Sequence, residues 1–284
     1  MIPSLHNGVS ALKSFSEGLQ VLSNNIANVN SLGYKSARAN FTDNFYIHQN
    51  NAGPAVNGEP RNTTRNHGSG VSVGSLSSNF NQGIIENTGL DLDLAIQGEA
   101  LPNAGGFFEV IDPESGEVFY TRAGAFESTT EGIVVTRDQN RFQLTNIEGQ
   151  PLLLGLEDGE DLLARRIDDD GVVSLIVSKD GQDSIRVAGQ VKIANFQAPQ
   201  YLQRTGNGFY SNGQPGENFA GLVENSIPGT GSNGKIKQYA LELSNVDLTN
   251  EFAMMISHQR SFQAGSRIVT TSDAILTEAV NLKR

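Results

Sequence analysis

The sequence predicts an α+β fold. Its N- and C-terminal helices form a coiled-coil-like pair, and its centre is a mainly antiparallel β domain, either barrel-like or sandwich-like. Apolar residues recur every seven positions at both ends of the chain, as in helices that pack along a seam. Between the ends, short β-branched runs alternate with turn signals, which favours an all-β domain.

The N-terminal helix is predicted from a heptad pattern in the first thirty residues. One heptad position holds Leu5, Leu12, Leu19 and Ile26, and the position three residues later holds Gly8, Phe15, Leu22 and Val29. All of these sites except Gly8 are apolar, which indicates a coiled-coil-type seam. A surface helix that lies on a globular core explains the same pattern, so this end of the chain leaves both interpretations open.

A second heptad pattern predicts a helix at the C-terminus. Its main position holds Leu248, Met255, Phe262, Val269 and Leu276, and Phe252, Ile256, Ile268, Ile275 and Leu282 widen the apolar face. Ser244 or Asn245 can cap the helix start, and Asp247 and Glu251 lie near the positive end of the helix dipole. Neither terminal helix has a helical neighbour in sequence, so we expect the two to pair. A pair alone leaves apolar surface exposed, which predicts that further copies cover it.

Changes in amino-acid composition along the chain predict its domain organisation. We expect residues 1–34 and 241–284 to form one discontinuous helical domain. Residues 35–75 include a long stretch that is polar and rich in Gly, Asn and Pro, which predicts an extended connector. Residues 76–240 are the predicted β domain, with room for a small outer subdomain at about 140–200.

Composition and charge exclude several classes of function. The net charge of -11 argues against nucleic-acid binding, because phosphate contacts need a basic surface. The chain has no cysteine, which rules out disulfides and thiol catalysis. No run approaches the roughly 20 apolar residues that cross a membrane, so we expect no membrane insertion. The N-terminus lacks the apolar core of a cleaved secretory signal.

The sequence offers only weak candidates for a catalytic or ligand site. "GTGSNGK", from Gly229 to Lys235, matches the spacing of a phosphate-binding loop, but Ile236 stands where a magnesium ligand is needed. The acidic stretches "DDDG" at 168–171 and "GLDLDLA" at 89–95 lack the ligand spacing of a calcium loop, so turns on an acidic surface are the better interpretation. We therefore expect no cofactor, no metal and no enzymatic activity.

The histidines also lack the spacing of a metal site or a catalytic triad. They are His6, His48, His67 and His258. His6 and His258 fall in the two predicted helices and are able to meet across them. A surface or interface histidine is nevertheless the default interpretation.

Long motifs resemble a known family of structural proteins. "LSNNIANVNSLGYKSARANF" at 22–41, with "GVSAL" before it, resembles the N-terminal signature of bacterial flagellar axial proteins, the rod and hook family. S-N-V-D-L, Q-R-x-F-Q and T-T-x-D resemble the C-terminal signature of the same family, and "FFEVIDPESGEVFYTRAGAF" looks like its β domain. The resemblance spans most of the chain. It departs where "EALPNAG" at 99–105 intervenes before "GFF", and it is weak from about 140 to 198.

This resemblance implies a protein that assembles with copies of itself into a helical tube. In the family, the paired terminal helices line the inner core of the tube. The resemblance suggests that Asn24, Asn25 and Asn28 bond between neighbouring subunits and that Gly33 is the hinge at which the chain leaves the core. It also implies export through the flagellar type III apparatus, contact with other axial proteins, and a place in the hook or basal body, periplasmic or extracellular.

Apolar burial at the helix seams is expected to drive this assembly. The expected assembly interface comprises Leu5, Leu12, Phe15, Leu19, Leu22, Ile26, Asn24, Asn25, Asn28, Leu248, Phe252, Met255, Phe262, Val269 and Leu276.

The sequence leaves the kind of protein open. "GVSAL" and the terminal "VNLKR" favour a short hook protein that transmits torque for motility, whereas the chain length favours a distal rod protein. A different class is a β domain that binds carbohydrate or peptide and oligomerises through helical arms. Another is a nucleotide hydrolase that acts through Lys235.

Overall fold

The computed structural model places most of the chain in two compact groups of residues. It describes residues 2–50, 65–98, 106–155, 161–179, 182–213, 220–223, 227–231 and 233–282, so the expected loop at 99–105 lies outside the described residues. Unit 1 comprises Met1–Ala27, Ala37–Ser78 and Asp247–Arg284, and unit 2 comprises Asn28–Ser36 and Asn79–Val246. We describe each unit by itself. The domain boundaries expected from the sequence stay predictions about which parts fold alone.

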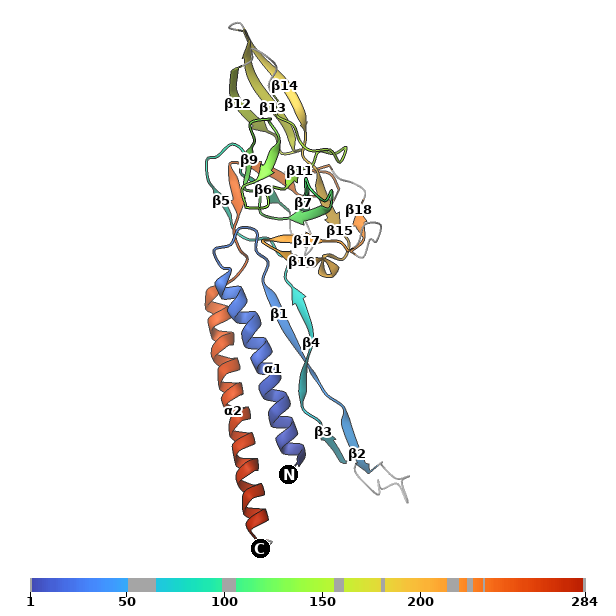
Figure 1. The fold of residues 1–284 in the computed structure, drawn as a ribbon, viewed down its shortest axis with the longest axis vertical. Coiled ribbons are helices and arrows are strands. Elements are labelled where there is room, and N and C mark those ends of the chain that lie inside the picture. The colour runs from blue at the N-terminus through green and yellow to red at the C-terminus, as the bar shows by residue number, and fades with distance from the viewer. Residues whose placement is uncertain are drawn as a thin grey trace, which may run out of the picture. The chain divides into compact units, whose positions relative to one another are not determined.

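Unit 1 is built on two long helices (Figure 1). α1 spans Ile2–Ala27 and α2 spans Leu248–Asn281. The helices run antiparallel, because Ser4 near the start of α1 contacts Ser272 late in α2, and Asn25 near the end of α1 contacts Glu251 early in α2. This arrangement confirms the predicted pairing of the terminal helices.

A β ladder packs on α1 in the same unit (Figure 1). β1 (Ala37–Asp43) pairs with β4 (Val71–Ser78), and β2 (Tyr46–Asn50) pairs with β3 (Arg65–Gly68), both antiparallel. These strands lie largely in the segment expected to be an extended connector. The composition of this segment is as polar as that of a loop, because polar side chains form hydrogen bonds across the ladder. The Asn40 side-chain amide donates to the hydroxyls of Ser75 and Ser77, each at 3.2 Å.

Antiparallel sheets form unit 2 and confirm the predicted β domain. In the described part of the chain, the largest sheet has the order β16-β17-β8-β7-β11-β10-β9, and β15 pairs with β7 and β18. Its strands are β7 (Phe107–Ile111), β8 (Val118–Thr121), β9 (Phe126–Ser128), β10 (Val134–Thr136), β11 (Gln143–Leu144), β15 (Ile193–Phe196), β16 (Gln203–Gly206), β17 (Phe209–Ser211) and β18 (Leu222–Val223).

Smaller sheets complete unit 2. β12 (Asp161–Ile167), β13 (Val172–Lys179) and β14 (Gln182–Gln190) form a meander. β6 (Leu94–Gln97) pairs with β19 (Lys235–Gln238), and β5 (Ile85–Asn87) pairs with β20 (Ala240–Glu242). A short 3-10 turn, η1, spans Pro199–Tyr201.

Unit 2 has two clusters of buried apolar residues, and the larger one joins the β12–β14 meander to the large sheet. Val173, Leu175 and Val177 alternate along β13 and are fully buried, as expected for a strand with one inward face. They belong to the same cluster as Phe108 and Val110 of β7, so the strands of the meander and the large sheet are packed together.

The two acidic stretches turn out differently. Asp168 to Gly171 form the turn between β12 and β13, as predicted. Asp93, in "GLDLDLA", is fully buried, so its interpretation as part of an acidic surface turn is wrong. The Thr88 hydroxyl donates to the Asp93 carboxylate at 2.6 Å, and Arg137 pairs with it at 2.8 Å. These partners compensate the burial of the charge.

No helix in the described residues is both long and apolar enough to span a membrane. The described residues also contain no cluster of three or more side chains suited to binding a metal ion.

Candidate functional site: the terminal helix pair

Asp247 caps the start of α2. Its carboxylate accepts hydrogen bonds from the backbone N–H groups of Thr249 at 2.9 Å and Asn250 at 3.4 Å. The expectation that Ser244 or Asn245 caps the helix is wrong. Both residues precede the cap, and the Asn245 side chain bonds within unit 2 instead.

Small residues let the two helices approach closely. A Cβ at Gly8 would meet Val269 Cγ2 at 2.9 Å and the backbone oxygen of Gly265 at 3.5 Å. The hydroxyls of Ser4 and Ser272 lie 3.2 Å apart and share a hydrogen bond across the pair. Close approach of this kind needs a glycine or serine rather than a large apolar side chain at the contact.

The seam uses only part of the apolar face that the sequence predicts. Among the expected interface residues, Leu22 and Asn25 are buried; Leu5, Leu12, Phe15, Leu19, Ile26, Asn28, Met255, Val269 and Leu276 are half-buried; and Asn24, Leu248, Phe252 and Phe262 are exposed. The residues that α2 buries are Glu251, Gly265 and Ser272. The contribution of the expected set to assembly stays a prediction.

Asn25 joins three elements of unit 1. Its side-chain oxygen accepts from the backbone N–H of Ala37 at 3.0 Å, and its amide donates to the backbone oxygen of Ala37 at 2.8 Å. The same amide lies 3.2 Å from Glu251 Oε2 on α2. Because Asn25 is fully buried, these bonds replace the hydrogen bonds that its amide would otherwise form with water. The amide therefore fixes where β1 starts against the two helices.

A cluster of three rings joins the same elements further along. The ring centroids of Phe15 on α1 and Phe41 on β1 lie 5.6 Å apart, and His258 on α2 lies 6.0 Å and 5.5 Å from them. A Cβ at Gly18 would meet His258 Nδ1 at 2.8 Å. His258 does not meet His6, since His6 lies nine residues before Phe15, about 13 Å along the axis of α1.

Acidification is expected to weaken unit 1 through His258. Its Nδ1 is buried without a hydrogen-bond partner in the described part of the chain, and burial lowers the pKa of the imidazole. Below the ordinary pKa of about 6.5 the unfolded chain then binds more protons than the folded chain. The contribution of the neutral ring to stability is therefore complete above about pH 6.5 and is lost as the pH falls through the lowered pKa.

Thermal unfolding of the helices, followed by circular dichroism from about pH 7.5 to about pH 5.5, measures this effect. His258→Leu should flatten the pH dependence, and the control His6→Gln, at an exposed position of α1, should preserve it. An unchanged slope in His258→Leu would contradict the assignment.

Residues 28–36 follow α1 and form part of unit 2. Gly33, the expected hinge, has a φ of 62°, and its N–H donates to the backbone oxygen of Glu242 at 2.8 Å. A Cβ at this position would lie 2.6 Å from both the backbone nitrogen of Ala123 and the backbone carbon of Arg122. The backbone conformation and the close approach each require glycine. Its role as a hinge between subunit parts stays a prediction.

A buried ion cluster fixes this segment within unit 2. Lys35 Nζ lies 2.6 Å from Glu242 Oε1, and an Arg122 guanidinium nitrogen lies 3.1 Å from Glu242 Oε2. All three side chains are buried. Lys35 also donates to the backbone oxygen of Asn81 at 2.9 Å, and the Gly83 N–H donates to Glu242 at 2.8 Å. One carboxylate therefore ties together segments from both ends of the chain.

The cluster carries more positive than negative charge. Burial and the nearby Arg122 charge lower the pKa of Lys35 to about 8, against the pull of Glu242. Burial alone would raise the pKa of the Glu242 carboxyl, but Arg122 and Lys35 outweigh it and hold that pKa below its ordinary value. Glu242 is thus the partner on which both cations depend.

Sequence reasoning missed this cluster. Lys35, Arg122 and Glu242 are far apart along the chain, and no local spacing connects them. The available signal was a charged residue between apolar neighbours, Leu241 and Leu243, in a short predicted strand.

The loop that matches the spacing of a phosphate-binding loop, Gly229 to Lys235, does not form a phosphate site in the described residues. Lys235, at the start of β19, is largely exposed, and its ammonium lies 4.0 Å from the Asp169 carboxylate. A carboxylate beside the lysine disfavours a phosphate ligand at this loop.

Comparison with known families matches both ends and the middle of the chain. Residues 5–35 match the family described as "Flagella basal body rod protein". Residues 95–182 match "Flagellar hook protein FlgE/F/G D1 domain". Residues 237–282 match "Flagellar basal body rod FlgEFG protein C-terminal". The matched ends contain most of the paired helices and the turn at Gly33.

Curated relatives match along the whole chain. The flagellar basal-body rod protein FlgG of Bacillus subtilis is 37% identical over 100% of both chains. FlgG of Caulobacter vibrioides is 30% identical over 99% of both chains. The flagellar hook protein FlgE of Borreliella burgdorferi is 33% identical over 61% of this chain and 38% of its own length. Together with the paired terminal helices and the central antiparallel sheets, these matches show that the chain belongs to the FlgE/F/G family of flagellar rod and hook proteins.

Proposed function

We propose that this chain is a subunit of the flagellar basal-body rod. The rod relatives match it from end to end, whereas the hook relative matches over less than half of its own length. This difference supports the rod over the hook, although the short terminal motifs favoured the hook. Within this proposal the chain is a non-enzymatic building block of the flagellar axis, as the family is structural.

Self-assembly is the proposed mechanism, and the apolar surface that α2 leaves exposed within unit 1 carries it. Phe252, Ile256, Ile268 and Ile275 are each about half exposed, at 49%, 52%, 46% and 53%. Burial of such side chains between copies contributes about 25 cal/mol per Å² of apolar surface. Since α1 covers only one face of α2, copies of the chain are the natural cover for the rest.

The expected interface residues then divide by position. Half-buried residues of the seam hold α1, α2 and the ladder together, and the exposed residues Leu248, Phe252 and Phe262 contact other copies. Asn25 uses its amide within its own chain. Bonds from Asn24 and Asn28 to a neighbouring subunit stay part of this proposal. Partners in this proposal are copies of the chain, other axial proteins and the type III export apparatus. The proposed location is the basal body.

Phe252→Asp is expected to abolish tube formation. The side chain is half exposed, so the monomer tolerates the carboxylate, whereas an unpaired charge buried between subunits costs several kcal/mol. Sedimentation and negative-stain microscopy measure assembly, and circular dichroism reports the fold. Phe262→Asp should act in the same way, and Leu19→Asp should in addition disturb the helix seam.

Ile185→Asp is the matched control, because it replaces an exposed apolar side chain by the same charge in unit 2, outside the α2 face proposed to contact other copies. Tubes formed by Phe252→Asp, or lost in Ile185→Asp, would refute the proposed interface. Gold labelling of isolated hook–basal bodies separates the two axial parts: label on the rod supports the proposal, and label confined to the hook contradicts it.

A further inference from the structure

We propose that Phe45 of one copy docks into a hollow on α2 of the next copy. The inference rests on the proposed self-assembly and adds which two surfaces of unit 1 meet. It starts from a protruding aromatic side chain, an open hollow, and the helix that lies between them.

The hollow lies on the face of α2 that points away from α1. It has a volume of about 460 Å³ and is lined by Ala253, Ile256, Ser257, Arg260, Ser261 and Ala264. At about 100° per residue, Ala253, Ile256 and Arg260 fall on the side of α2 away from the buried residues Glu251 and Gly265. Ser261 lies at the edge of the buried face. Four of the six lining residues have the short side chains of alanine or serine, Ile256 is apolar, and Arg260 is a cation.

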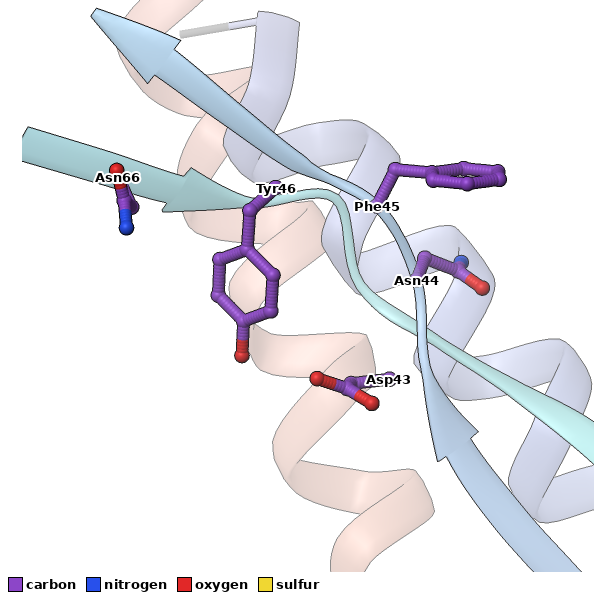
Figure 2. Close-up of a pocket in the computed structure, with 5 residues that line it drawn as sticks. All are labelled: Asp43, Asn44, Phe45, Tyr46 and Asn66. Carbon is purple, nitrogen blue, oxygen red and sulfur yellow. The ribbon is translucent and has the colours of Figure 1, made fainter. Parts of the chain in front are cut away.

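Phe45 is the matching protrusion. It lies between β1 and β2 and is 91% exposed. Figure 2 shows its ring pointing away from Tyr46 and Asp43, which lie on the other side of the strand. So large an exposed aromatic surface is unfavourable in water and typical of a contact site.

Hydrogen bonds fix the backbone on both sides of Phe45. The Asn44 N–H donates to the backbone oxygen of Gly70 at 2.9 Å, and the Ser69 N–H donates to that of Phe45 at 3.1 Å. The Ser72 hydroxyl donates to the Asn44 side chain at 2.9 Å. Docking therefore orders little additional backbone, which favours binding.

The two surfaces meet only between different copies. The β1–β4 ladder packs on α1 (Figure 1) and reaches α2 through the contact of Phe41 with His258, whereas the hollow opens on another face of α2. Phe45 of the same chain therefore cannot enter it. A contact between two different patches of identical subunits is heterologous and propagates from copy to copy rather than closing a dimer.

The positions of the two surfaces also fix a stagger between neighbours. Phe45 lies beside Gly70, and Gly70 lies against Ser10 of α1. Gly8 contacts Val269, and the helices are antiparallel, so Ser10 is level with a point near residue 267 of α2. The hollow is centred about nine residues earlier, so neighbouring copies are displaced by roughly 13 Å along the helix axis.

The chemistry of the hollow suits an aromatic side chain. Ile256 and the short side chains accept the edge and one face of the ring by apolar contact. The Arg260 guanidinium is able to lie over the other face, where it interacts favourably with the ring electrons. The same interaction occurs inside unit 2, where Arg122 lies 5.2 Å from the centroid of the Phe107 ring.

Photo-crosslinking from position 45 tests this contact. The photoreactive phenylalanine analogue p-benzoyl-phenylalanine replaces Phe45 and keeps an aromatic ring there. After irradiation of assembled protein, we expect a covalent dimer in which position 45 is joined to a residue between 253 and 264 of another copy. Isotope-labelled and unlabelled chains mixed before assembly identify, by peptide mass spectrometry, products formed between copies.

Two matched variants sharpen the test. The same photoreactive residue at Leu76, which is 63% exposed on the same ladder, should not label the hollow. Ser257→Trp fills the hollow at an exposed position and should reduce labelling from position 45 at least tenfold. Its unchanged circular dichroism would show that unit 1 remains folded.

The outcomes separate this inference from the proposed function. Tubes that form without a crosslink to residues 253–264, or with a crosslink only inside one copy, overturn the docking inference and leave self-assembly standing. If wild-type protein forms no tubes even on added rod fragments, the proposed function fails and the docking inference fails with it. Tubes with the expected crosslink support both.

Discussion

Glu242→Gln is expected to lower the free energy of unfolding of unit 2 by roughly 3–5 kcal/mol, because it leaves two buried cations without their anion. Glutamine keeps the size of the side chain and an oxygen that accepts from Gly83, so the change removes mainly the charge. Lys35→Met should cost less. Arg122 and Glu242 remain paired in that variant, and the lowered pKa of Lys35 shows that its charged form is already disfavoured.

Urea unfolding followed by near-ultraviolet circular dichroism measures the difference, since the buried tyrosines Tyr120 and Tyr210 report the packing of unit 2. Glu127→Gln is the matched control. Glu127 pairs with Arg141 at 3.1 Å, but both side chains are substantially exposed, so the expected loss is about 0–1 kcal/mol. Equal losses for Glu242→Gln and Glu127→Gln would show that the buried cluster is not essential.

Gly33→Ala is expected to destabilise unit 2 by roughly 2–5 kcal/mol, the sum of two effects. A non-glycine residue at a φ of 62° is strained, and the added Cβ lies 2.6 Å from backbone atoms of Arg122 and Ala123. Those atoms belong to the peptide between β8 and β9 and are not free to move aside as a flexible side chain is.

Gly149→Ala isolates the first of these effects. Gly149 has a φ of 76°, but a Cβ there meets nothing within 4 Å, so we expect a loss of about 1–2 kcal/mol from backbone strain alone. The same unfolding experiment compares the two variants. A loss for Gly33→Ala no greater than that for Gly149→Ala would mean that the segment shifts away from Arg122 without penalty.

Periodicity in the sequence was enough to predict the elements of this fold but not their contacts. The heptads at the two ends predicted both helices and their pairing, because one apolar face in each must be covered. The heptads did not predict that the helices meet at residues such as Gly8, Gly265 and Ser272. The distance between two helices depends on the size of the side chains at their contact, and a pattern of hydrophobic residues contains no information on size. Large residues such as Phe252 consequently remain exposed.

Polar residues were harder to place from the sequence. The resemblance suggested that Asn25 bonds a neighbouring subunit, whereas in the structure Asn25 is a buried link between α1, β1 and α2. The strands at 37–50 and 65–78 have the composition of a loop and are held by backbone pairing and hydroxyl–amide bonds. Lys35 and Glu242 form a pair through tertiary folding alone, so no local pattern reveals it.

The contacts that close each unit join residues from opposite ends of the chain. Lys35 and Glu242 are 207 residues apart, Asn25 and Glu251 are 226 apart, and Ser4 and Ser272 are 268 apart. Closing such long loops is entropically unfavourable and slow. A chain that emerges N-terminus first therefore cannot complete unit 2 until Glu242 is free, and it cannot complete unit 1 until α2 is free. Unit 1 holds both the first and the last helix, so it is the last of the two to close.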